Sequence, residues 1–396
     1  MGIYEYIIGI CLIFTLSHIF NIISEKTKIP SVIMLIILGI VVKKTMLFYG
    51  YNIMVPFKVL QILGTVGLVL IVLEGTIELQ LSSDKIGIMK KALNTSLLLL
   101  ILSIITIAGI ITLALGTSYI NAIIYAIPIS IISSAMVIPS IKSLTEIKKE
   151  FIIYEATFSD IIGIIIFNLF AYGNINSLID ITEFSLSLIM IILVSILFSI
   201  LLIFILGKTK EGTKIVMILS VLLLIYSIGK TYHLSSLILI LVFGIIINNF
   251  DEILNFFKIR QKTEKIFNVR STFLALREMK LINRELSFAI RTLFFFVFGF
   301  SMEIEKILKK EIILSGIVII LLIYLIRYIN LKVILKENVF PEIMIAPRGL
   351  ITILLYYSIP KEYQIEYFEE GVLFFIIIVT SIVMMIGLLC YKKPKE

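Results

Sequence analysis

Two acidic residues and one arginine lie inside long apolar stretches of the chain. Glu155 and Asp160 belong to one stretch, which reads Tyr-Glu-Ala-Thr-Phe-Ser-Asp over 154–160, and Arg327 lies in another. A charge at the centre of a bilayer costs about 2.5 to 3.5 kcal/mol, so each of these residues needs a partner or a purpose. Positions five apart on a helix point about 140° away from each other, so the two acids cannot share one face. We therefore expect them to have different tasks.

Glu155 and Arg327 have matching predicted depths, each about one turn and a half from the same membrane surface. We expect them to form a buried ion pair that holds two halves of the protein together. Asp160 is then left near the midplane without a fixed cation, free to bind a proton or a metal cation. The alternative is a structural Asp160 that is protonated or hydrogen-bonded to a neighbouring helix. Intramembrane acids commonly mark ion or proton pathways, which favours a binding site.

Residues that interrupt helices occur at mid-depth in two other apolar stretches. The first contains Pro128, Ser133, Ser134 and Pro139, and the second contains Pro341 and then Pro347, Arg348 and Gly349. Unwound carbonyls and serine hydroxyls are expected to complete a cation shell around Asp160, with Thr157 and Ser159 as further candidate ligands. Arg348 would offset the negative ends of half-helices. For any single proline an ordinary kink is the simpler explanation, so the prediction depends on their matching positions.

The composition places these residues in a membrane. Of the 396 residues 60% are hydrophobic and only 16% are charged, which exceeds the apolar content of a soluble domain. The formal net charge of +8 is spread over short clusters between apolar runs, which argues against nucleic-acid binding. We expect an all-α protein in the lipid bilayer of the cell membrane, without a cofactor.

About thirteen transmembrane helices are predicted. Their ranges are 3–23, 30–48, 57–79, 88–115, 121–141, 151–171, 184–206, 213–230, 234–250, 287–303, 311–331, 340–358 and 371–391. Most Lys and Arg residues lie in the loops that follow the odd-numbered spans and in the C-terminal tail. Positive residues are retained on the cytoplasmic side, so the N-terminus is expected outside and the C-terminus inside.

The longest polar connection, 251–286, mixes Phe and Leu with Lys and Arg. It is predicted to be a basic amphipathic helix on the cytoplasmic membrane surface, with a plain solvated linker as the alternative. An odd number of spans suggests two inverted six-helix repeats, spans 1 to 6 and 8 to 13, joined by span 7. The broken helices of spans 5 and 12 would then occupy corresponding positions and cross each other.

Taken together, these residues resemble the monovalent cation:proton antiporters of the sodium/proton exchanger type. The stretch Glu155-Ala-Thr-Phe-Ser-Asp160 is similar to that family's Glu-Ser-x-Phe-Asn-Asp signature in its sixth helix. Weaker similarities follow in the expected order, at Ile29-Pro30, Leu38-Gly39, Leu73-Glu74-Gly75, Phe294-Phe295-Phe296, Gly299 and Arg348-Gly349.

The resemblance implies a homodimer in which each protomer has a scaffold, spans 1 to 3 and 7 to 10, and a moving core, spans 4 to 6 and 11 to 13. It implies that Asp160 binds Na⁺, Li⁺ or K⁺ in exchange for a proton, by alternating access, and that Glu155 pairs with Arg327. Two departures bear on the mechanism. Ser159 replaces the Asn or second Asp of relatives, and Ser133-Ser134-Ala135 stands where many have Thr-Asp-Pro. A single titrating acid favours one proton per cation.

Two other functions fit an apolar chain of this kind. A channel-like potassium efflux system of this family would normally append a cytoplasmic nucleotide-binding domain, whereas only 391–396 follow the last predicted span. An intramembrane enzyme is disfavoured because the sequence has no His-Glu-x-x-His motif. Exchange of a monovalent cation for protons is the function that the sequence favours.

Overall fold

The computed structural model is built from helices throughout the residues that it describes. These are 3–27, 29–51, 57–77, 83–173, 178–208, 214–231, 236–250, 252, 269–335 and 339–392. The first half contains α1 (Ile3–Thr27), α2 (Ser31–Phe48), α3 (Phe57–Ile77), η1 (Ser83–Lys85), α4 (Ile86–Leu115), α5 (Tyr119–Ser130), α6 (Ser134–Ser140) and α7 (Glu146–Tyr172). The second half contains α8 (Leu178–Lys208), α9 (Lys214–Thr231), α10 (Ser236–Asn248), α13 (Val269–Ser301), α14 (Ile304–Ile307), α15 (Lys310–Leu335), η2 (Glu342–Met344), α16 (Leu350–Tyr357), η3 (Lys361–Tyr363) and α17 (Glu370–Cys390).

The described helices confirm a multi-pass membrane protein. Eight segments are long and apolar enough to cross a bilayer, counting α5 and α6 as one interrupted span, and three shorter apolar segments lie in α8, α9 and α10. The remaining two predicted spans correspond to the C-terminal half of α13 and to the broken segment that leads into α16. The predicted all-α architecture of about thirteen spans is therefore correct, while the inverted repeat stays a prediction.

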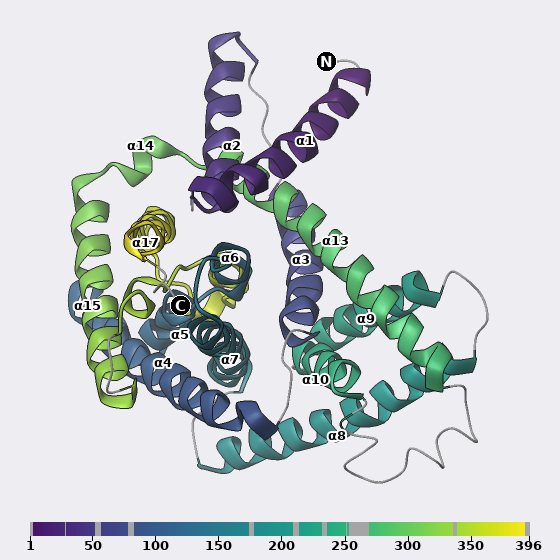
Figure 1. The fold of residues 1–396 in the computed structure, drawn as a ribbon. Coiled ribbons are helices and arrows are strands. Elements are labelled where there is room, and N and C mark those ends of the chain that lie inside the picture. Colours follow the sequence, from purple (N-terminus) through teal and green to yellow (C-terminus); the bar gives the residue numbers. More distant parts are fainter. Residues whose placement is uncertain are drawn as a thin grey trace. The chain divides into compact units, whose positions relative to one another are not determined.

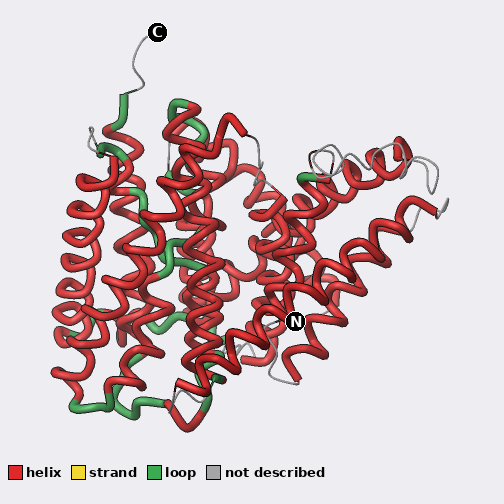
Figure 2. Tube along the Cα trace, turned by 90° about the horizontal axis from the view of Figure 1, so that it is seen from below, coloured by secondary structure: helices red, strands yellow, loops and turns green. Residues whose placement is uncertain are grey.

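The two spans with helix breakers are not continuous helices. α5 ends at Ser130, two residues after Pro128, and the chain is extended from Ile131 to Ser133 before α6 begins. In the predicted span 340–358 only 350–357 is α-helical, because Pro341 and Pro347 lack the N–H that a helix needs and force the preceding residue toward extended backbone. Figure 2 shows non-helical segments, in green, within the bundle as well as at its ends.

The predicted span 287–303 is the C-terminal part of a longer helix, α13, which is described from Val269 to Ser301. The C-terminal part of the predicted connector 251–286 is therefore the start of α13, with Leu274 and Leu281 exposed. Residues 251 and 253–268 lie outside the described residues, and the placement of the connector on the membrane surface stays a prediction.

The described chain divides into two compact units. The first comprises 1–65, 88–163 and 289–396, and the second comprises 66–87 and 164–288. In the first unit α15 packs against α17 and α5 against α16, while in the second α10 packs against α8 and α9 (Figure 1). The predicted division into scaffold and core follows different boundaries and stays a prediction.

Two glycines let α2 and α13 approach each other within the first unit. A Cβ atom on Gly39 would lie 2.3 Å from the carbonyl oxygen of Phe296, and one on Gly299 would lie 2.2 Å from that of Ile36. Both obstacles are backbone atoms, which cannot rotate away as a side chain can. The closeness of these helices explains why glycine occupies both positions.

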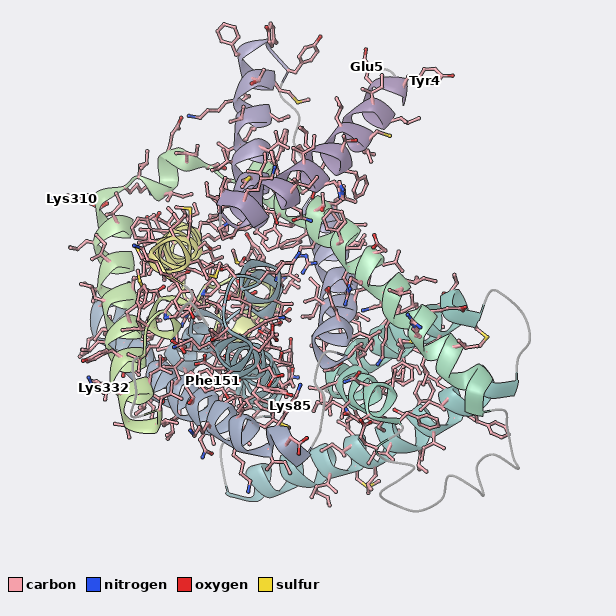
Figure 3. The ribbon with its side chains drawn as sticks, viewed as in Figure 1. Tyr4, Glu5, Lys85, Phe151, Lys310 and Lys332 are labelled. Carbon is pink, nitrogen blue, oxygen red and sulfur yellow. The ribbon has the colours of Figure 1, made fainter. Side chains whose placement is uncertain are left out.

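Charged residues lie near the ends of α1 and α15. Tyr4 and Glu5 lie at the start of α1, and Lys310 and Lys332 lie near the two ends of α15 (Figure 3). Arg327 lies between those two lysines and is fully buried. The ends of α15 thus carry charges that water or lipid headgroups can solvate, and Arg327 requires partners inside the protein.

Candidate functional site

Asp160 lies on α7, and its side chain is buried with only 4% of the residue exposed. One carboxylate oxygen, Oδ2, accepts a hydrogen bond of 3.2 Å from the backbone N–H of Ser134. The other, Oδ1, has no hydrogen-bond partner among the described residues. The carboxylate is therefore held in place from one side and is available for a ligand on the other.

Hydroxyl groups at the start of α6 and on α7 are further candidate cation ligands beside Asp160. Ser133 and Ser134 lie at the start of α6, and Thr157 precedes Asp160 by three positions on α7, which places both on neighbouring parts of one helix face. The hydroxyls of Ser133 and Thr157 are buried and have no hydrogen-bond partner among the described residues. Together with Asp160 Oδ1, these oxygens could coordinate a small cation.

Ser159 has a different position from the other candidate ligands. Its hydroxyl oxygen accepts a hydrogen bond of 3.0 Å from the backbone N–H of Ile132, in the extended segment between α5 and α6. This bond and the one between Ser134 and Asp160 connect α7 to the interrupted span on both sides of Ser133. Ser159 thus satisfies a backbone donor that the broken helix leaves without an intrahelical partner.

The two interrupted segments meet directly. The backbone N–H of Ser133 donates to the carbonyl of Pro347 at 2.9 Å. A Cβ atom on Gly349 would lie 2.6 Å from Ser133 Oγ and 2.8 Å from Met136 Sδ, so any larger residue here would displace these two side chains. Pro347 and Gly349 therefore bring one broken segment against the serine of the other, next to α7.

Arg348 is fully buried and donates to carbonyl groups. Its Nε bonds to Ile129 O at 2.8 Å and its Nη2 to Ser130 O at 3.2 Å, and its Nη1 bonds to Ala346 O. Ile129 and Ser130 form the last turn of α5, where carbonyls lack intrahelical donors and the helix dipole is negative. The guanidinium thus neutralises the end of a half-helix, and among the described residues Asp160 forms no ion pair with it.

Glu155 and Arg327 form a buried, bidentate ion pair. Arg327 Nη1 lies 2.7 Å from Glu155 Oε1 and Nη2 lies 2.9 Å from Oε2, and neither side chain is more than 1% exposed. Arg327 also donates to the carbonyl of Glu342 from Nε at 3.0 Å and from Nη2 at 2.8 Å. Both predicted partners are thus together, on α7 and α15, and Asp160 is separate from them.

Sequence reasoning did not single out three residues that hold this region. Thr380 Oγ1 on α17 accepts a bond of 3.1 Å from the backbone N–H of Arg348. Glu342 is buried and forms an ion pair with Lys148. A usable signal existed for two of them, since Thr380 interrupts an otherwise apolar span and Glu342 directly follows Pro341.

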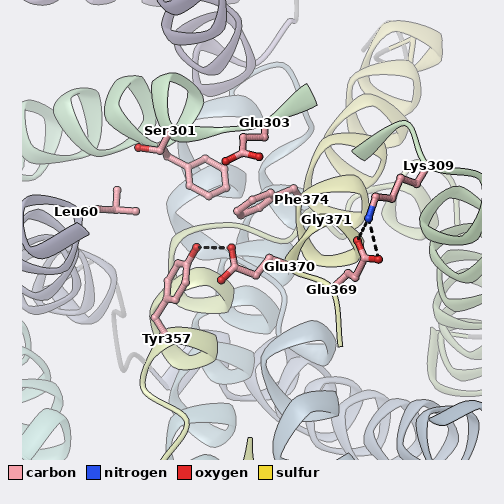
Figure 4. Close-up of a pocket in the computed structure, with 10 residues that line it drawn as sticks. Leu60, Ser301, Glu303, Lys309, Tyr357, Glu369, Glu370, Gly371 and Phe374 are labelled. Carbon is pink, nitrogen blue, oxygen red and sulfur yellow. Dashed lines mark hydrogen bonds and ion pairs between the residues drawn. The ribbon is translucent and has the colours of Figure 1, made fainter. Parts of the chain in front are cut away.

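A cavity of about 370 Å³ lies elsewhere in the first unit (Figure 4). It is lined by Leu60, Phe298, Ser301, Glu303, Lys309, Tyr357, Glu369, Glu370, Gly371 and Phe374. Lys309 pairs with Glu369, and the Tyr357 hydroxyl donates to Glu370 at 3.4 Å. None of the residues around Asp160 lines this cavity, so the cavity is separate from the carboxylate site.

Broken helices that meet beside a buried polar site are typical of secondary transporters. The sequence matches the family described as sodium/hydrogen exchanger, transmembrane, over residues 11–390. The chain therefore belongs to the sodium/hydrogen exchanger family and functions as a cation:proton antiporter, which is a transporter.

Solved structures of an archaeal protein share this fold. The structure of the sodium proton antiporter MjNhaP1 from Methanocaldococcus jannaschii at pH 8 has a TM-score of 0.70 and 15% identity, covering 97% of this chain and 100% of that one. An electron-microscopy structure of the same antiporter has a TM-score of 0.71 and 17% identity, covering 100% of both chains. The comparison with curated protein sequences gives no match.

Proposed function

We propose that Asp160 is the exchange site, which binds either a proton or a dehydrated monovalent cation and never both. The observation that carries this proposal is a buried carboxylate with one oxygen fixed by the Ser134 N–H and the other without a partner among the described residues. A buried negative charge of this kind is costly unless it is neutralised. Binding of a proton or of a monovalent cation neutralises the Asp160 carboxylate, so the buried site favours both forms over the free carboxylate.

The cation shell would consist of Asp160 Oδ1 with the hydroxyls of Ser133, Ser134 and Thr157 and with carbonyls of the extended segments. Oxygen ligands of this kind suit Na⁺, Li⁺ or K⁺. One titrating acid in the site supports one proton exchanged for one cation, which makes the cycle electroneutral. Ser159 supports the site by holding the Ile132 backbone.

Alternating access would move the core, spans 4 to 6 and 11 to 13, relative to the scaffold, spans 1 to 3 and 7 to 10. The Glu155–Arg327 pair would keep the core together during this movement. We further propose that the protein is a homodimer in the cell membrane. The N-terminus would lie outside and the C-terminus in the cytoplasm, an orientation that the distribution of Lys and Arg favours.

Exchange in proteoliposomes tests the site. Wild-type protein is expected to move protons when Na⁺, Li⁺ or K⁺ is added, and to do so equally with the membrane potential clamped. Asp160→Asn should abolish this movement, because an amide cannot exchange a proton for a cation. Asp84→Asn makes the same chemical change at an exposed residue of η1 and should leave exchange unchanged.

An Asp160→Asn variant that elutes as folded protein and still exchanges would refute the assignment. Single-channel currents from the wild type in planar bilayers, in place of coupled counterflow, would instead favour the channel-like alternative.

A further inference from the structure

A second ion pair lies beside the Glu155–Arg327 pair and has no part in the exchange described above. Lys148 Nζ, in the first turns of α7, pairs with Glu342 Oε1 and also donates to the carbonyl of Phe340 at 3.1 Å. The Glu342 side chain is 4% exposed and that of Lys148 is 26% exposed. The pair therefore joins a buried carboxylate to an ammonium group that reaches toward the surface.

The segment 340–342 is held by cations from two helices. Lys148 on α7 binds the carbonyl of Phe340 and the side chain of Glu342, while Arg327 on α15 binds the carbonyl of Glu342 twice. Lys148 and Glu155 are seven positions apart on α7, which places them on one helix face about 10 Å apart along the axis. Two acids and two bases thus balance their charges around a short piece of non-α-helical chain.

This piece of chain leads directly to the exchange site. Between Met344 and Leu350 the chain has no regular helix, so contacts with other elements determine its position. At its far end, Pro347 accepts the N–H of Ser133 and the Arg348 N–H is held by Thr380. The backbone N–H groups of Met344 and Ile345 donate to the carbonyls of Pro341 and Glu342, so a shift at Glu342 is passed along the chain toward Pro347.

We propose that Lys148 and Glu342 are positioning residues for cation binding, and we call their ion pair the anchor pair. The anchor pair fixes the start of the non-helical segment, and through Pro347 it sets the place of Ser133 relative to Asp160. This inference rests on the proposed function, because it assigns an effect on the Asp160 site. A purely structural ion pair would affect the amount of folded protein and leave the affinity of each folded molecule unchanged.

The test measures the apparent KM for Na⁺ and the maximal exchange rate per folded protein in proteoliposomes. Lys148→Met and Glu342→Gln should each raise the KM for Na⁺ about tenfold, because the cation ligands would be slightly misplaced. The maximal rate should stay within about twofold of that of the wild type. Lys148→Arg, which keeps the charge, should restore KM. Lys149→Met removes the surface pair with Glu146 and should leave both parameters unchanged.

The outcomes separate this inference from the proposed function. Unchanged KM in both Lys148→Met and Glu342→Gln, alongside an inactive Asp160→Asn, would overturn the anchor pair alone. Full exchange by folded Asp160→Asn would overturn the exchange site itself. If Lys148→Met does not fold, Glu342→Gln decides the matter, because glutamine keeps the shape and hydrogen-bonding capacity of the side chain.

Discussion

Breaking the Glu155–Arg327 pair one partner at a time should cost far more stability than removing both. The two side chains are at most 1% exposed and share two hydrogen bonds of 2.7 and 2.9 Å. Removing one partner of a buried pair leaves an uncompensated charge, which costs about 3 to 5 kcal/mol. Replacing both by apolar residues of similar volume removes that charge, so the double variant should lose less stability than either single variant, and less than the sum of the singles by more than about 3 kcal/mol.

The two single variants should also differ from each other. Arg327→Met leaves the buried carbonyl of Glu342 without the two donors that it has now, which adds about 1 to 3 kcal/mol, whereas Glu155→Met leaves that carbonyl bonded. We therefore expect Arg327→Met to be less stable than Glu155→Met. The double variant Glu155→Met/Arg327→Met should recover much of the stability that the single variants lose. Exchange by the molecules that do fold should persist in the double variant.

The assay is the fraction of detergent-purified protein that stays monodisperse after a fixed time at increasing temperature, read by size-exclusion chromatography. Glu369→Gln serves as the control, because its pair with Lys309 is about half exposed on both sides and is expected to contribute less than about 1 kcal/mol. Strictly additive losses would show that the pair is not coupled. Single variants that are stable but inactive would place the pair in the transport pathway.

Three further outcomes follow from the close contacts and the shared site. Gly349→Ala should raise the KM for Na⁺, because the new Cβ would lie 2.6 Å from Ser133 Oγ and turn that hydroxyl away; an unchanged KM in exchange assays would exclude Ser133 from the site. Gly299→Ala should reduce thermal stability by about 1 to 3 kcal/mol, since Ile36 O lies 2.2 Å from the new atom and α2 must move; heating and chromatography measure it, and wild-type stability would contradict the described contact. Where protons outcompete the cation for Asp160, each lower pH unit should raise the apparent KM about tenfold by mass action; exchange measured over a range of Na⁺ concentrations at each of several pH values checks this, and a KM independent of pH would refute simple competition.

The membrane architecture could be predicted because it depends on local composition. Runs of about 20 apolar residues identify spans wherever they occur, and the break at Pro347 follows from its missing backbone donor. Pro128 lies inside α5, and the chain leaves the helix only after Ser130. The start of α13 at Val269 could not be found in this way, since the polar first half of that helix does not read as membrane-spanning. A window of hydropathy detects only the part of a helix that lipid surrounds.

Only part of the site could be predicted from the sequence, because several of its contacts join residues that are far apart along the chain. Glu155, Asp160 and Arg327 stand out because charges are rare in apolar runs. Lys148 lies near the end of its helix, where lysine is ordinary, and its pairing with Glu342 joins residues 194 positions apart. Ser159 as a cation ligand stays a prediction. Its hydroxyl also accepts the Ile132 N–H, a contact that could be predicted only by knowing where α5 ends.

The central claim is that one carboxyl group gives up its proton when a cation binds. Adding Na⁺, Li⁺ or K⁺ to the purified wild-type protein in weakly buffered detergent solution should release protons, up to one for each chain, at a pH where Asp160 is protonated. Folded Asp160→Asn should release none under the same conditions. Equal proton release from that variant, or no release from the wild type across the pH range in which it stays folded, would contradict the claim.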